Sequence, residues 1–232
     1  MSDYFVDREI LYTERKMPIC EDLPPYVTQF IVGIQMRTTP LTRFAYANDI
    51  KIFLNYLLKS RYKNRYTDVR QITLDDLSQL TAFDIEMFLE YLSYYTVDGK
   101  KVKCGERAKE RKLSALRSFF KYFFKHDLLE SNITQKVDTP KSHDKPIVYL
   151  EKNEISRLLN EATTGESLSG REKSYHALTK ERDIAILSLM LGTGIRISEC
   201  VGIDIKDLNL ETNTVLITRK GGNRTILYFS NE

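Results

Sequence analysis

Apolar residues recur every three or four positions in four stretches before Lys125, and this pattern restricts the first part of the chain to helices. Such spacing places apolar side chains on one face of an α-helix, where they pack against other helices. Thr39-Pro40 supplies an N-cap followed by proline at the first helical position, and Thr81 with Asp84 forms an approximate capping box. The expected helices are residues 25–35, 39–57, 81–95 and 107–125. The pattern predicts a helical bundle of about a hundred residues.

The chemistry of the chain changes after the bundle, where polar residues and prolines have the composition of a linker. The elements expected beyond it are helices at 151–162, 182–191 and 197–202 and strands at 214–218 and 225–229. Gly221 and Gly222 favour a hairpin between the strands, because glycine adopts positive φ readily. The expected divisions are an N-terminal arm or short helix at 1–20, a helical domain at 21–128, a linker at 129–146 and a mixed domain at 147–232. The predicted fold class is mostly α with a small β-hairpin or sheet.

Composition argues against several classes of protein. No stretch approaches the roughly 20 apolar residues that a membrane span needs, and residues 1–16 carry charges where a signal peptide would be apolar. Cys20, Cys104 and Cys200 are scattered, which favours neither a disulfide framework nor a zinc site. We therefore expect a cytoplasmic protein with no metal, no cofactor and no membrane partner. The net charge of +3 says little about partners, whereas the distribution of charge says more.

Positive charge is concentrated between Lys100 and Lys125, where ten Lys or Arg residues stand against two acidic ones. Arg117, Lys121 and Lys125 recur at a spacing of four, away from the apolar stripe, which suits contact with DNA phosphates. A solvated basic face produces the same pattern and, from these residues alone, is at least as common. The candidate DNA-binding residues are Lys109, Arg111, Lys112, Arg117 and Lys121.

Two turns place a basic residue close to glycine. Arg196 follows Gly194 at the start of a short helix, and a guanidinium beside free helix amides can bind a phosphate. Lys220 lies on the hairpin turn, from which a flexible lysine could reach a scissile phosphate. From spacing alone, a structural explanation is the commoner one for both residues: Arg196 is then an exposed arginine after a C-cap glycine, and Lys220 an exposed lysine on a turn.

The order of these motifs resembles tyrosine-type site-specific recombinases, the phage-integrase family with its Xer-like members. Residues 182–187, 193–199 and 203–208 closely resemble the family's first catalytic-arginine region. In the second half of the chain, residues 217–226 resemble the family's catalytic-lysine hairpin, and residues 146–159 resemble the entry to its catalytic domain. In the first half, residues 24–125 resemble the four-helix (SAM-like) core-binding domain, whose second helix matches the pattern around 42–53. The resemblance implies double-stranded DNA at a recombination site as the partner and, for an intact family member, other protomers in a DNA-bound tetramer.

The resemblance also implies a mechanism. A tyrosine hydroxyl attacks the scissile phosphate, forms a 3′-phosphotyrosyl link and releases a 5′-hydroxyl, with no metal or cofactor. By motif match, Arg196 is the first catalytic arginine, which holds charge on the non-bridging oxygens, and Lys220 is the general acid. Glu199 matches the acidic residue beside that arginine and is expected to orient it.

One departure from the family pattern bears on activity. The His-x-x-Arg motif, a later Gly-His pair and the tyrosine nucleophile follow the lysine hairpin in the family, and none of them occurs in this sequence. Tyr228 stands where a strand residue belongs and is not assigned as the nucleophile. We therefore expect this chain to bind DNA weakly without cleaving it.

Several alternatives stay open at this point. The chain can be a fragment of an active recombinase, or a truncated, non-catalytic protein that occupies recombination sites. A helical protein-interaction module is a third reading, which the arginine region argues against. Single residues do not reveal the DNA target sequence or the oligomeric state. They also do not distinguish chromosome-dimer resolution from element integration.

Overall fold

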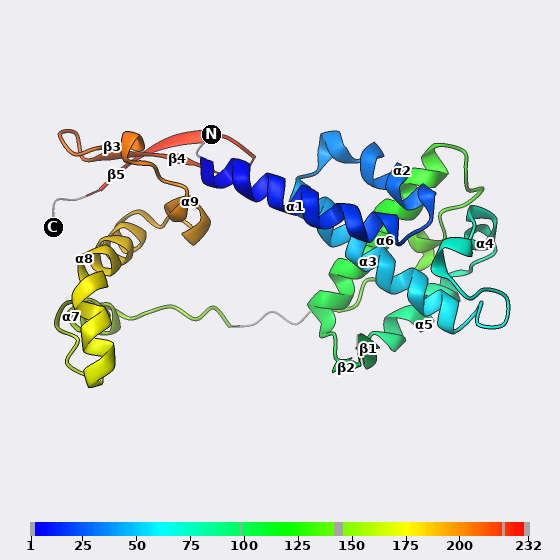
Figure 1. The fold of residues 1–232 in the computed structure, drawn as a ribbon, viewed down its shortest axis with the longest axis horizontal. Coiled ribbons are helices and arrows are strands. Elements are labelled where there is room, and N and C mark those ends of the chain that lie inside the picture. Colours follow the sequence, from blue (N-terminus) through cyan, green and yellow to red (C-terminus); the bar gives the residue numbers. More distant parts are fainter. Residues whose placement is uncertain (1–2, 98, 142–145, 220, 230–232) are drawn as a thin grey trace. The chain divides into compact units, whose positions relative to one another are not determined.

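The computed structural model describes residues 3–97, 99–141, 146–219 and 221–229. The chain groups into two compact units, which we name the helical unit (Glu9–Asp144) and the mixed unit (Met1–Arg8 with Lys145–Glu232). Figure 1 shows the elements of both units along the chain. Within the described ranges, no helix is both long enough and apolar enough to span a membrane.

The helical unit is built around α6, which packs against α2 and α3. Its α-helices are α1 (Asp3–Glu21, whose first residues belong to the mixed unit), α2 (Pro25–Gly33), α3 (Pro40–Lys59), α4 (Leu74–Ser78), α5 (Ala82–Tyr91) and α6 (Glu106–Lys125). Short 3-10 helices η1 (Gln35–Arg37), η2 (Val69–Gln71) and η3 (Ile133–Lys136) and a hairpin of β1 (Tyr95–Val97) and β2 (Lys100–Val102) complete it. Phenylalanines fill the core: Phe30, Phe53, Phe88, Phe119, Phe120 and Phe123 are fully buried.

The predicted capping signals lie at the expected helix starts. The Thr39 hydroxyl accepts a hydrogen bond from the backbone N–H of Thr42 at 3.3 Å, and α3 begins with Pro40. Asp84 accepts a bond from the backbone N–H of Thr81 at 2.8 Å and so closes the capping box of α5. Local hydrogen bonding therefore fixes where these two helices begin.

Two segments differ from their sequence-based expectation. The helix expected to reach Tyr95 ends at Tyr91, and Tyr95 pairs with Val102 in the β1–β2 hairpin. The positive φ of Gly99, 75°, allows the tight turn that joins these strands. The N-terminal segment, expected to be a loose arm or a short helix, forms the 19-residue helix α1.

The first half of the expected linker packs on the bundle. Leu129, Ile133 and Val137 are spaced by four, and all three belong to the buried core. Arg117 of α6 donates a hydrogen bond to the carbonyl of Val137 at 2.7 Å. In the described chain, buried core residues therefore extend to Val137, further than the polar composition suggested.

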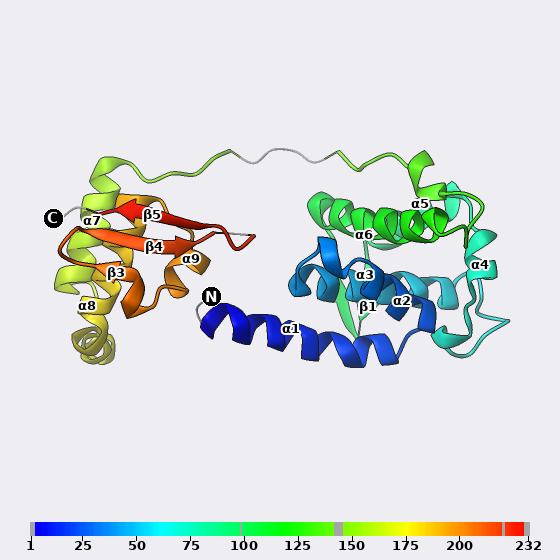
Figure 2. The same cartoon turned by 90° about the horizontal axis from the view of Figure 1, so that it is seen from above.

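The mixed unit combines helices with a small antiparallel sheet. Its elements are α7 (Lys152–Thr164), α8 (Gly170–Thr193), α9 (Ile197–Val201), η4 (Ile205–Asp207), β3 (Leu208–Asn209), β4 (Thr214–Thr218) and β5 (Arg224–Tyr228). The strand order is β3–β4–β5, with β4 in the middle (Figure 2). Val215 and Ile217 of β4 are buried with Ile195 in a small core. The predicted fold class, mostly α with small β structure, is confirmed.

Candidate functional site

The turn between α8 and α9 positions Arg196. Gly194 ends α8 with a φ of 66°, a left-handed conformation that a residue with a side chain adopts only with strain. The next residue, Ile195, is buried in the small core and fixes the turn to the sheet. Arg196 then occupies the N-cap position of α9. The glycine and the buried isoleucine together determine where the arginine stands.

Glu199 anchors Arg196 through two hydrogen bonds. The backbone N–H of Arg196 donates to Oε2 of Glu199 at 2.9 Å, and the guanidinium Nη1 donates to Oε1 at 3.1 Å. The Glu199 side chain is 3% exposed, whereas the Arg196 side chain is 70% exposed. A guanidinium carries five N–H donors, so an exposed guanidinium held at one nitrogen can still bind an anion.

Glu199 is ionised despite its burial. The hydrogen bond from the Arg196 backbone lowers the pKa of this carboxyl below its usual value, against the opposing effect of burial. The Arg196 guanidinium and the positive charge of Arg219 lower it further. The orienting role expected for Glu199 fits this geometry. The expectation that free amides at the start of α9 help to bind a phosphate does not fit this geometry. Glu199 already accepts the Arg196 N–H, and α9 has only five residues.

The hairpin that follows has the predicted form. Thr218 pairs with Arg224 at the end of the two strands, and the backbone N–H of Arg219 donates to the carbonyl of Asn223 at 2.7 Å. Gly221 and Gly222 have φ values of 93° and 84°, as the paired-glycine signal requires. Lys220, the expected general acid, lies outside the described residues.

Tyr228 lies in β5 and pairs with Thr214, which agrees with its sequence-based interpretation as a strand residue. Its side chain is exposed. The hydrogen bonds that join Arg196 and Glu199 in the described part of the chain do not include Tyr228. The structure thus gives no reason to assign it as a nucleophile.

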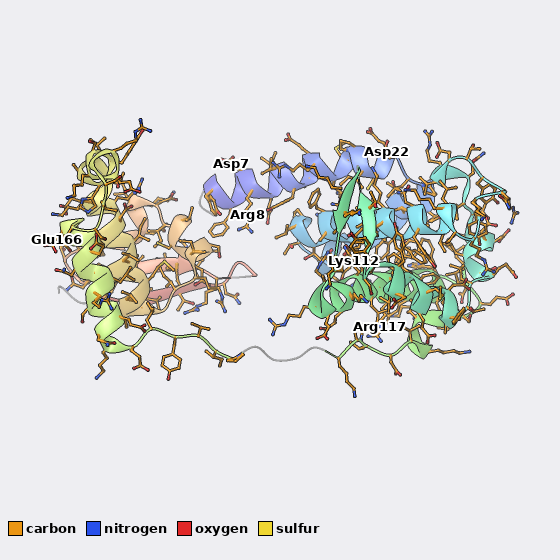
Figure 3. All side chains as sticks on the ribbon, turned by 90° about the horizontal axis from the view of Figure 1, so that it is seen from below. Asp7, Arg8, Asp22, Lys112, Arg117 and Glu166 are labelled. Carbon is orange, nitrogen blue, oxygen red and sulfur yellow. The ribbon has the colours of Figure 1, made fainter. Side chains whose placement is uncertain are left out.

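Lys112, one of the five candidate DNA-binding residues, lies inside the helical unit. It is 6% exposed, and its Nζ donates to Oδ1 of Asp49 on α3 at 2.8 Å. Figure 3 labels Lys112 and Arg117 on α6. The expectation that Lys112 offers its charge to phosphates does not fit this placement, because Lys112 stands on the face of α6 that also buries Leu116.

Three further candidates have protein partners. Arg111 is half exposed and donates with both terminal nitrogens to Asp49, the Nη2 bond being 2.8 Å. Arg117 donates to the Val137 carbonyl and to the Thr139 hydroxyl, and Lys109 donates to the Ser93 hydroxyl at 2.6 Å. Lys121 is exposed and has no ion pair within the described ranges. The basic helix is therefore largely organised by contacts within its own unit.

Asp49 was not among the sequence-based candidates. It is 1% exposed and accepts hydrogen bonds from Arg111 and Lys112, so it holds α3 and α6 together. The sequence pattern that could have identified it is an acidic residue on the same helical face as Phe53, together with a lysine on the apolar face of α6. A search for opposite charges on two buried stripes would have found this pair.

No group of three or more His, Cys, Asp or Glu residues that could hold a metal ion occurs in the part of the chain that the structure describes. The cysteines at 20, 104 and 200 are all free thiols.

In chain order, the structure has a helical unit, an anchored arginine turn and a glycine-rich hairpin. Residues 148–232 match the phage integrase family. The chain belongs to the tyrosine recombinase family.

Curated relatives carry the same family name. Tyrosine recombinase XerS of Lactococcus lactis subsp. cremoris (strain MG1363) is 30% identical over 229 residues, which cover 90% of this chain and 64% of the relative. XerS of Streptococcus thermophilus (strain ATCC BAA-491 / LMD-9) is 31% identical over 203 residues, 79% of this chain and 57% of the relative. The chain thus spans less than two thirds of the length of these relatives.

Two crystal structures share the fold. XerH site-specific recombinase bound to palindromic difH substrate, a post-cleavage complex, aligns with a TM-score of 0.55 and 20% identity, covering 81% of this chain and 48% of that one. A lambda integrase(75-356) dimer bound to a COC′ core site aligns with a TM-score of 0.56 and 14% identity, covering 88% and 61%. At these identities the likeness concerns the fold.

Proposed function

We propose that this chain binds duplex DNA at a recombination site and supplies part of the active site of a site-specific recombinase or integrase. The observation that carries the proposal is the exposed guanidinium of Arg196, held by the buried carboxylate of Glu199. An arginine fixed in this way binds a phosphate with little loss of conformational freedom. We also propose a cytoplasmic location, as expected from the sequence.

In the proposed reaction, a tyrosine oxygen attacks the scissile phosphorus while the bond to the 5′-oxygen breaks. The product is a 3′-phosphotyrosyl link and a 5′-hydroxyl, and the reverse attack rejoins the strand. Arg196 stabilises the charge that develops on a non-bridging oxygen. Lys220 donates the proton that the departing 5′-oxygen takes up. Glu199 keeps Arg196 in place and does not itself react.

The proposal also assigns domains and partners. We assign residues 1–20 to an N-terminal arm and 21–137 to the core-binding domain, because the segment after 128 packs on the bundle. We assign residues 138–146 to the linker and 147–232 to the catalytic domain. In an intact recombinase, further protomers join on paired DNA sites as a tetramer.

We assign no nucleophile among these 232 residues and therefore propose that this chain by itself binds DNA without cutting it. The supporting observation is that the tyrosine after the hairpin, Tyr228, is a paired strand residue. A nicked suicide substrate, on which a cleaved strand stays attached to protein, tests this assignment. A covalent complex that Tyr228→Phe abolishes would overturn it.

DNA binding itself is tested by titrating a labelled duplex with the chain at several salt concentrations. Binding through phosphates should weaken linearly in a plot of log K against log salt concentration, with a slope of about −0.9 for each phosphate contacted. A helical protein-interaction module has no such dependence on a duplex. The absence of binding even at about 50 mM salt would contradict the proposal.

A further inference from the structure

We infer that an open cavity at the start of α6 is a seat for one phosphodiester of the DNA backbone. This inference rests on the proposed function and goes beyond the basic outer face of α6 by naming a place where a phosphate binds. The cavity has a volume of about 620 Å³ and lies wholly in the helical unit. Three lysines from separate segments line it: Lys103, Lys109 and Lys141.

The three lysines approach the cavity from different parts of the chain. Lys103 follows β2, Lys109 lies in α6, and Lys141 lies beyond the segment that packs on the bundle. Lys103 and Lys141 are exposed, and Lys109 is half buried. Among the described residues that line the cavity, Glu106 is the one acidic residue beside three lysines, so positive charge exceeds negative charge in this lining. An anion placed between cations from three segments neutralises charges that otherwise repel one another.

Lys109 is held in position before any ligand arrives. Its Nζ donates a hydrogen bond to the hydroxyl of Ser93, 2.6 Å away, and Ser93 also lines the cavity. An ammonium group has three N–H donors, so this bond leaves two for an anion. A side chain ordered in the free protein loses less conformational entropy when it binds. Lys109 is therefore a prearranged ligand, whereas Lys103 and Lys141 are free to adjust.

The shape of the cavity favours a polymer phosphate over an isolated ion. It is open to solvent and larger than a single phosphate needs, which allows the sugars on either side of a phosphodiester to stay outside. Gly105, the N-cap of α6, lines it without a side chain, so the backbone of a strand can approach closely there. The hydroxyl and the lysines read no base edge, so the seat fixes register without adding sequence preference.

The test uses the full chain and a labelled duplex, with affinity measured across a series of salt concentrations. The double variant Lys103→Gln, Lys141→Gln removes the two adjustable cations. The expected result is a loss of affinity of about threefold to tenfold at low salt, and a slope of log K against log salt that is shallower by about 1. The matched control, Lys63→Gln with Lys136→Gln, makes the same change of charge at exposed lysines outside the cavity.

A second variant tests Lys109 without changing charge. Ser93→Ala should lower the affinity while the salt slope stays as in the wild-type chain, because Lys109 keeps its charge but loses its orientation. Ser93→Thr, which restores a hydroxyl, should recover the affinity. Circular dichroism confirms that each variant has the helical content of the wild type.

The outcomes separate the two proposals. If the wild-type chain does not bind the duplex, the proposed function fails and the seat fails with it. If the wild type binds with a steep salt dependence but the cavity variant keeps the same affinity and slope, only the seat is overturned. Equal losses in the cavity variant and the control would also overturn it, because the effect would then be one of overall charge.

Discussion

Asp49 and Lys112 form a buried ion pair between α3 and α6, with Oδ1 and Nζ 2.8 Å apart. Their side chains are 1% and 7% exposed, so both charges are largely shielded from solvent. Arg111 shares the same carboxylate from the surface side. The pair therefore fixes the position of α6 against α3, and its removal should lower the stability of the whole helical unit.

Asp49→Asn should destabilise the helical unit by about 3–5 kcal/mol, because it leaves the Lys112 charge buried without a compensating carboxylate. Urea unfolding followed by far-UV circular dichroism measures the change. The matched control is Asp22→Asn, which breaks the exposed pair between Asp22 and Lys51 and should cost at most about 1 kcal/mol. Similar losses in both variants would show that the buried pair contributes no more than the surface pair.

Lys112 and Lys121 should behave differently in DNA binding although both were sequence-based candidates. Lys121→Gln removes an exposed cation and should make the salt dependence of binding shallower by about 1. Lys112→Met removes a buried charge and should leave that slope unchanged, provided that the measurement is made where the variant is folded. A shallower slope for Lys112→Met would mean that this lysine reaches DNA after all.

The sequence identified helices well where a local signal and an apolar stripe coincide. Thr39 and Pro40 define the start of α3, and the glycines at 221 and 222 define the hairpin, because these effects act within a few residues. Lys112 could not be assigned in this way, since its partner Asp49 is distant along the chain. The spacing of charges on α6 looks the same whether a cation faces water, a carboxylate or a phosphate.

The site shows the same division between local and distant effects. The motif around Arg196 predicts an orienting role for Glu199, three residues away, and the two hydrogen bonds between them follow from a capping geometry. The end of the bundle was placed too early because Leu129, Ile133 and Val137 stand among polar residues that resemble a linker. Packing against α5 and α6 decides their burial, and a composition average does not contain that information.

Arg117 should act as a tether for the segment that leaves the bundle. Its guanidinium donates to the Val137 carbonyl and to the Thr139 hydroxyl, at 2.7 and 2.8 Å. Arg117→Ala leaves that carbonyl without this donor and should destabilise the unit by about 1–2 kcal/mol. Hydrogen exchange at residues 137–141 should become faster. Arg117→Lys keeps the charge but loses the bidentate geometry of the guanidinium. If this variant restored protection from hydrogen exchange, charge alone would be sufficient.

Glu199 should make the stability of the mixed unit depend on pH. The pKa of the folded-state carboxyl is lowered by the hydrogen bond from the Arg196 backbone, so the ionised form stabilises the fold. This contribution is fully present above the pKa of the unfolded chain, about 4.3, and is lost as the pH falls through the lower folded-state pKa. Glu199→Gln keeps an acceptor for the backbone N–H but cannot ionise, so it removes only the pH-dependent part.

The difference in unfolding free energy between the wild type and Glu199→Gln should therefore be about 1–2 kcal/mol near neutral pH. It should shrink toward zero in acid, because both side chains are then uncharged. Other carboxyls with lowered pKa values, such as Asp183, titrate in both proteins and cancel in the difference. A difference that stays constant from neutral to acidic pH would show that the glutamine disturbs packing around Arg196, and that the charge of Glu199 does not hold the arginine in place.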